Sequence, residues 1–86
     1  RLQIGHFSAA LQAALQVRAS LVSSGDLDVY RLVDGAGDGV PGIYLDRLGP
    51  AAILSIYEDA RLSDAATTEA ADLCLERLRG IGVNAV

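Results

Sequence analysis

Six consecutive residues, Gly37-Asp38-Gly39-Val40-Pro41-Gly42, match the spacing G-x-G-x-x-G with which some α/β domains bind a dinucleotide. That chemistry requires the glycines to open directly onto a helix, because the helix N-terminal amides and dipole face the pyrophosphate. Here the segment leads into residues 43–48, which alternate like a strand, and Gly49-Pro50 ends that strand too soon for a crossover helix. We therefore interpret it as a glycine turn between two strands.

Four carboxylates near this turn are candidate calcium ligands: Asp26, Asp28, Asp34 and Asp38. An EF-hand loop requires oxygen ligands at fixed alternate positions and a closing glutamate at the twelfth, and this spacing does not provide them. We interpret the aspartates as turn residues whose side chains accept hydrogen bonds from nearby backbone amides.

His6 and Cys74 are the remaining candidates for nucleophilic or acid-base chemistry. His6 has no serine or cysteine partner at a recognisable spacing, so we expect it at a helix start or on the surface. Cys74 lies in an apolar helical pattern and outside any C-x-x-C motif, which indicates a buried thiol in a reducing, cytoplasmic compartment. We predict no catalytic, cofactor-binding or metal-binding residue in this chain.

Asp46 and Arg47 are adjacent in a predicted strand, so their side chains should point to opposite faces of a sheet. One of the two charges must then face inward or toward a partner. An inward arginine could clamp a carboxylate or a group of carbonyls at an interface. Solvated charges on an edge strand are the alternative, and the sequence leaves both open.

The elements that must position these residues follow from periodicity and turn signals. We predict helices at residues 7–22 and 65–79, the first capped by Ser8 and the second by Ser63 or Asp64. Strands are expected at 29–33, at 43–48, at 51–57 as a central strand buried on both faces, and from 81 to 86. Residues 34–42 hold four glycines and a proline and are expected to form an irregular loop.

This order, helix-strand-strand-strand-helix-strand, predicts an α+β fold: a small, mostly antiparallel sheet with two helices packed on it. The 86 residues form one small module, whose stability is expected to be marginal without a neighbouring domain. The net charge is −4, and the seven basic residues, all arginine, form no cluster, which argues against binding of phosphates by this segment alone. We expect neither a signal peptide nor a membrane span, and the first residue, Arg1, suggests a fragment.

Three stretches of the sequence resemble the central signature of the RlmI-like large-subunit ribosomal RNA cytosine-5 methyltransferases. They are Tyr30-Arg31-Leu32-Val33-Asp34-Gly35, Asp38-Gly39-Val40-Pro41-Gly42-Ile43 and Asp46-Arg47-Leu48-Gly49. The family signature reads R-L-[VI]-x-G-E-x-D-G-L-P-G and then D-R-[YF]-G, after an A-L-x-x-R helix that Ala14 to Arg18 matches. The resemblance covers residues 7–57 well, and the terminal helix and strand by pattern only. Ala36 replaces the family's glutamate and Leu48 its aromatic residue.

The resemblance implies a non-catalytic central module of an S-adenosylmethionine-dependent RNA methyltransferase active in rRNA processing. In such enzymes an RNA-binding PUA domain and a Rossmann domain, which holds the cofactor and the catalytic cysteine, flank this module. The expected partners are therefore other domains of the parent chain and, through the full-length protein, rRNA. Asp38, Pro41, Asp46 and Arg47 are the candidate interdomain or RNA contacts. The alternative is a free-standing protein-interaction domain.

Overall fold

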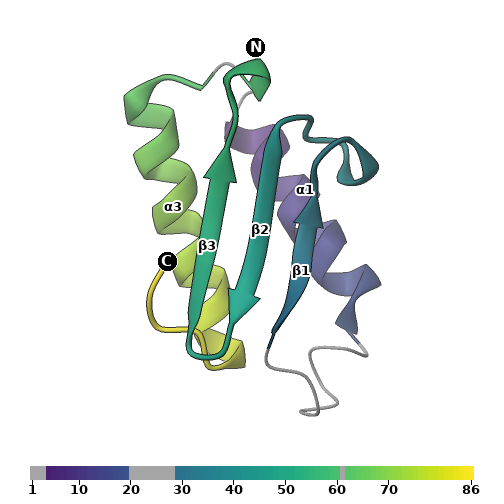
Figure 1. The fold of residues 1–86 in the computed structure, drawn as a ribbon, viewed down its shortest axis with the longest axis vertical. Helices are drawn as coiled ribbons and strands as arrows, with labels where there is room; N and C mark the ends of the chain where they lie inside the picture. The colour runs from purple at the N-terminus through teal and green to yellow at the C-terminus, as the bar shows by residue number, and fades with distance from the viewer. Residues whose placement is uncertain (1–3, 20–28, 61) are drawn as a thin grey trace.

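The computed structural model describes residues 4–19, 29–60 and 62–86 as a helix, a three-stranded antiparallel sheet and a second long helix (Figure 1). The elements are α1 (Ile4–Val17), β1 (Val29–Asp34), β2 (Ile43–Leu48), β3 (Ala51–Ile56) and α3 (Asp64–Leu78), with 3-10 turns η1 (Gly35–Asp38), η2 (Glu58–Ala60) and η3 (Arg79–Ile81). The strands follow one another in space as β1-β2-β3. The predicted α+β class and the order helix-strand-strand-strand-helix are confirmed.

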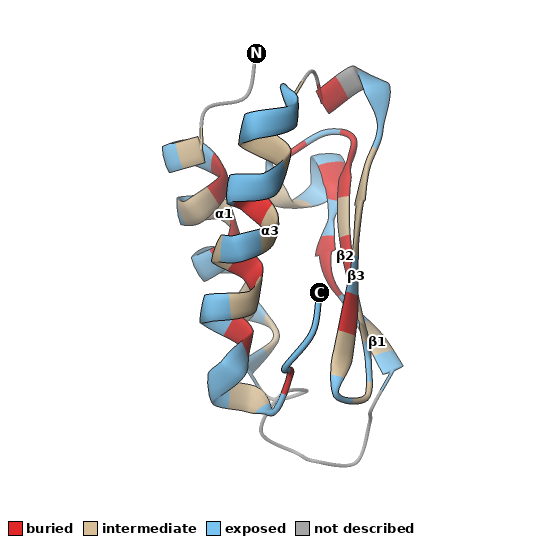
Figure 2. Ribbon diagram, turned by 90° about the vertical axis from the view of Figure 1, so that its left-hand side faces the viewer, coloured by how far each residue is buried: buried red, intermediate tan, exposed pale blue. Residues whose placement is uncertain are grey.

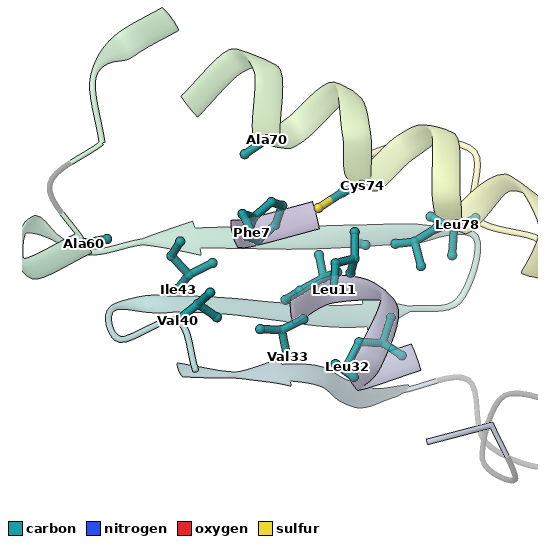
Figure 3. Packing of buried hydrophobic residues seen from close by; sticks show 14 residues of the cluster. Phe7, Leu11, Leu32, Val33, Val40, Ile43, Ala60, Ala70, Cys74 and Leu78 are labelled. Carbon is teal, nitrogen blue, oxygen red and sulfur yellow. The ribbon is translucent and has the colours of Figure 1, made fainter. Parts of the chain in front are cut away.

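The described elements form two layers, with α1 and α3 on the same face of the sheet (Figure 2). Aliphatic side chains from the helices and strands meet between the layers, and Phe7 and Leu11 of α1 lie among them (Figure 3). No described helix covers the other face of the sheet, which we call the open face. Its side chains are those that alternate with the core residues along the strands: Val29, Arg31, Asp34, Tyr44, Asp46, Leu48, Ala51, Ile53, Ser55 and, just after β3, Tyr57.

Helix α1 begins earlier than predicted, at Ile4, because Ile4 packs against the core and extends the helix. The prediction that Ser8 is the N-cap is wrong: Ser8 lies within the helix, and its hydroxyl oxygen accepts a 3.3 Å hydrogen bond from Arg77 Nη2 of α3. The predicted end of this helix, at residues 20–25, lies outside the described residues. In α3, by contrast, Ser63 is the N-cap as predicted, accepting from the amide of Ala66 at 3.1 Å.

Strand β3 is an edge strand of the described sheet, and the prediction of a central strand buried on both faces is wrong. The central strand is β2, which pairs with both neighbours. In β3 only Ala52 is fully buried, and Ile53 is 52% exposed on the open face. A continuous apolar sequence favours burial on both faces, but in the described structure only one face of this strand is covered.

The predicted strand at residues 81–86 does not form within the described structure. The chain after α3 makes the turn η3, and Gly82 adopts a left-handed φ of 91°, which interrupts an extended conformation. Only an isolated parallel bridge between Ala85 and Ala51 remains, with the Ala52 amide donating to the Ala85 carbonyl at 2.9 Å.

Strand β1 contains an irregularity between Arg31 and Val33, where the register with β2 shifts by one residue. Such a bulge reverses the alternation of side chains along a strand. Leu32 and Val33 are consequently both buried, although they are neighbours, and Asp34 lies on the same side of the sheet as Arg31.

No helix among the described residues is long and apolar enough to cross a membrane.

Candidate functional site

The glycine turn joins β1 to β2, as predicted, and does not open onto a helix. The expectation that it holds no regular structure is wrong, since Gly35–Asp38 form the 3-10 turn η1. Contacts from outside the turn stabilise it: Val40 is fully buried in the core. Asp38 accepts from Arg18 Nη1 at 3.1 Å and from Arg18 Nη2 at 3.0 Å.

Asp38 also accepts a 2.6 Å hydrogen bond from the backbone amide of Asp34, which confirms the predicted role of a turn aspartate. Its side chain is 12% exposed and that of Arg18 is 20% exposed. Burial acts to raise the pKa of Asp38, but the hydrogen bonds from Arg18 and from the Asp34 amide, with the charge of Arg18, lower it overall. The Arg18–Asp38 pair therefore holds α1 against the turn. Of the other candidate calcium ligands, Asp26 and Asp28 lie outside the described residues.

The surface of the turn carries two more of the residues singled out from sequence. His6 lies exposed in the first turn of α1, as expected, and its Nε2 is 2.8 Å from the carbonyl oxygen of Gly39. Pro41 is exposed two residues further along. Pro41 is therefore available for contact, whereas the carboxylate of Asp38 is already engaged within the chain.

Asp46 and Arg47 point to opposite faces of β2, as predicted. Arg47 lies on the helix-covered face, where its Nη1 donates to the hydroxyl of Tyr30 at 3.0 Å and its Nε to the carbonyl of Gly49 at 2.9 Å. It also lies over the Tyr30 ring, with Cζ 5.8 Å from the ring centroid. Asp46 lies on the open face, so the fold does not bring the four candidate contacts into one surface.

Asp46 belongs to an ion-paired cluster on the open face that the sequence analysis missed. Arg31 Nε and Nη2 donate to the two carboxylate oxygens of Asp46 at 2.8 and 3.2 Å, and Arg31 Nη1 donates to Asp34 at 3.4 Å. The hydrogen bond to Asp46 is the largest cause of a raised pKa for Arg31. One guanidinium against two carboxylates leaves this cluster with a net charge of −1.

Tyrosine rings adjoin the cluster. Arg31 Cζ lies 4.9 Å from the centroid of the Tyr44 ring, and Tyr57 meets Tyr44 edge to face with centroids 5.5 Å apart. Arg31, Tyr44, Ser55 and Tyr57 line a hollow of about 210 Å³. This is a polar and aromatic hollow on the open face, away from the helices.

An apolar row lies beside the hollow, across the sheet end where β2 and β3 are joined. Val29 pairs with Leu48, and Leu48 pairs with Ala51, so these three side chains are cross-strand neighbours. Val29 is 66% exposed and Leu48 is 40% exposed. Ile53, which pairs with Asp46, adjoins this row. Together the four residues present aliphatic surface that the described part of the chain does not cover.

One sequence signal could have identified the open-face residues. Tyr44 and Asp46 alternate with Ile43 and Leu45, which marks the second face of β2. Predicting their cross-strand partners Arg31 and Ser55 would have required the strand registers, and the register of β1 contains the bulge.

The described residues do not fit a cofactor loop or a metal centre. The glycine turn leads into β2, so its amides do not form the helix N-terminus that binds cofactors in α/β domains. The described ranges contain no cluster of three His, Cys, Asp or Glu side chains placed to hold a metal ion. Cys74 is fully buried in α3, and burial raises the pKa of its thiol to about 12, so it does not provide a thiolate.

The chain is similar to ribosomal RNA large subunit methyltransferase I. It is 38% identical over 73 residues to the proteins of that name from Escherichia coli (strain K12) and from Shigella boydii serotype 18. The match covers 78% of this chain but only 18% of each relative. No family model matches the chain.

The matched region extends beyond residues 7–57, on which the motif resemblance rests. The chain therefore resembles a short segment of these relatives and spans less than a fifth of their length. The glycine turn and the Asp46-Arg47 pair, which carry the resemblance, both have structural contacts in the fold.

Proposed function

We propose that this chain is the non-catalytic central module of an S-adenosylmethionine-dependent methyltransferase that acts on a cytosine of large-subunit rRNA. The observation that carries the proposal is the 38% identity to ribosomal RNA large subunit methyltransferase I, over a match that covers 18% of that protein. The D-G-x-P-G turn and the Asp46-Arg47 pair support it, because they are the residues of the family signature.

In this proposal the module holds an RNA-binding domain and a cofactor-binding catalytic domain in a fixed relative position. The two-layer fold suits such a role, since its turn is fixed by the Arg18–Asp38 pair and its sheet presents one face that no described helix covers. Asp38, Pro41, Asp46 and Arg47 are the proposed contacts. Of these, Pro41 and Asp46 have surface accessible from outside, while Asp38 and Arg47 support the contact from within the module.

The experiment uses the product of the complete reading frame that contains residues 1–86. Incubated with S-adenosylmethionine and large-subunit rRNA from cells that lack the modification, it should form 5-methylcytosine, measured by mass spectrometry of digested RNA. The 86-residue chain alone should form none, and the product lacking these residues should lose most of the activity. A reading frame without a cofactor-binding domain, or a full-length product without methyl transfer, would reject the proposal.

A free-standing protein-interaction domain is the second candidate, and the uncovered aliphatic row on the open face favours it. Size-exclusion chromatography and thermal melting of the 86-residue chain distinguish the two. A stable chain encoded by a reading frame that adds no further domain supports the second candidate.

A further inference from the structure

The open face of the sheet has two adjoining parts with different chemistry. The first is the aliphatic row of Val29, Leu48 and Ala51 with Ile53 beside it, in which Ile53 is 52% exposed. Aliphatic side chains adjacent on one flat face lose contact with water only if another apolar surface covers them. This part of the face is therefore suited to a protein surface and offers nothing that would pair with phosphates.

The second part of the open face is the hollow, and the charge of the groups around it determines which kind of ligand group it can accept. Arg31 forms its wall, but hydrogen bonds to Asp46 and Asp34 already engage this guanidinium, and the three groups together carry −1. An anion placed in the hollow would lie beside a net negative cluster within a chain of net charge −4. RNA, whose backbone carries one negative charge per nucleotide, is disfavoured for the same reason.

A basic side chain, in contrast, finds complementary groups in the hollow and beside it. The rings of Tyr44 and Tyr57 offer π faces, and the Ser55 hydroxyl offers an acceptor. The carboxylates of Asp34 and Asp46, which pair with Arg31 beside the hollow, supply the excess negative charge. A volume of about 210 Å³ is of the order of one long side chain.

We propose that the open face docks a second protein domain of the same longer polypeptide, one that presents aliphatic side chains to the Val29–Leu48–Ala51 row and one arginine or lysine to the hollow. This inference rests on the proposed function, because the curated relatives contain about four fifths of their length outside the matched segment, which is 18% of each.

The test is cysteine labelling in the product of the complete reading frame. Ile53→Cys and Leu48→Cys report on the open face, and Val17→Cys, at a residue 77% exposed in α1, is the matched control. N-ethylmaleimide modification is followed at each position by peptide mass spectrometry; the native Cys74 is buried and adds little background. We expect labelling at positions 53 and 48 to be at least about tenfold slower than at position 17. Comparable rates at all three positions would overturn the proposal.

Two further measurements identify what covers the open face. Asp46→Asn removes the excess negative charge and keeps an acceptor for Arg31, so with a basic occupant it should speed labelling of Ile53→Cys several-fold. Asp72→Asn, at an exposed acid of α3, is the matched control and should leave that rate unchanged. An unchanged or slower rate with Asp46→Asn rejects the basic occupant. Protection that disappears after ribonuclease treatment identifies RNA and rejects a protein domain.

The labelling result can be separated from the test of the proposed function, because methyl transfer is measured on the Val17→Cys protein. Methyl transfer without protection at positions 48 and 53 rejects this inference alone. Protection without methyl transfer rejects the rRNA methyltransferase assignment and leaves the docked face standing.

Discussion

The backbone of Gly35 lies against the ring of Tyr44, so closely that a Cβ atom added at Gly35 would come within 2.9 Å of Tyr44 Cζ. Gly35 also adopts a φ of 55°, in the left-handed region that favours glycine. The turn and the open face are thus joined at this point, because the glycine that allows η1 to form also allows Tyr44 to lie where it walls the hollow.

Gly35→Ala should lower the free energy of unfolding by about 2–4 kcal/mol, since it adds a left-handed backbone cost to a steric conflict with Tyr44. Gly39→Ala is the matched control: its φ is 79°, but a Cβ there would meet nothing within 4 Å. The control should therefore lose only about 1 kcal/mol. Urea denaturation measures both, and equal losses would contradict the close approach of Tyr44.

The Arg18–Asp38 pair should make stability depend on acid. Asp38→Asn should lower the free energy of unfolding at pH 7 by about 1–3 kcal/mol, because it breaks a charged hydrogen-bonded pair that is largely buried. The pKa of Asp38 is lowered in the folded chain, so its contribution is fully present above the unfolded pKa of about 3.9 and is lost as pH falls through the folded value.

Urea denaturation from pH 7 down to pH 2 checks this, and the Asp38→Asn chain should show a flatter acid limb than the native chain. Asp34→Asn is the control at pH 7: it removes an ion pair with Arg31 in which the Asp34 side chain is 57% exposed. Such a pair contributes about 0–1 kcal/mol. Identical acid limbs for the native and Asp38→Asn chains would reject the role given to this pair.

The Cys74 thiol should not react with dithionitrobenzoate at pH 8 until the chain unfolds. It is fully buried, and burial raises its pKa to about 12, so the folded chain presents a neutral and inaccessible thiol. Because its folded pKa is raised, the neutral Cys74 thiol contributes to stability below the unfolded thiol pKa of about 8.5. This contribution decreases as the pH rises above that value. Fast labelling of the native chain in the absence of denaturant would contradict the packing of α3.

The two serines proposed as caps from sequence should respond differently to alanine. Ser63→Ala removes the acceptor for the Ala66 amide and should cost about 1 kcal/mol, with loss of helicity in α3. Ser8→Ala lies within α1 and removes only a 3.3 Å hydrogen bond from exposed Arg77, so the change should stay within about 0.5 kcal/mol. Circular dichroism during thermal melting compares the two, and a larger loss at Ser8 would reject the observed helix start.

Local signals predicted the parts of the fold that depend on neighbouring residues. The hairpin from β2 to β3 follows from Gly49-Pro50, where Gly49 adopts the positive φ of 65° that such a turn requires. The Ser63 cap follows from its position before an apolar helical pattern. Opposite orientations of Asp46 and Arg47 follow from the strand period alone.

The structural features that could not be predicted from the sequence depend on contacts between residues that are distant along the chain. Packing of Ile4 against the core sets the start of α1. Ile53 is exposed because no described layer covers its face of the sheet. The residues adjacent in sequence predict neither of these features. The open-face site was missed because Arg31 meets Asp46 across 15 residues of sequence. Only the strand register brings the two together.

The bulge in β1 has a consequence for how the sequence can vary in length. Deleting one residue between Arg31 and Asp34 would restore regular alternation with both charged side chains still on the open face. It would leave the core one aliphatic side chain short, because Leu32 and Val33 are both buried. The bulge thus places a second aliphatic side chain of β1 in the core, and a one-residue deletion here should cost core packing without reversing the faces of the strand.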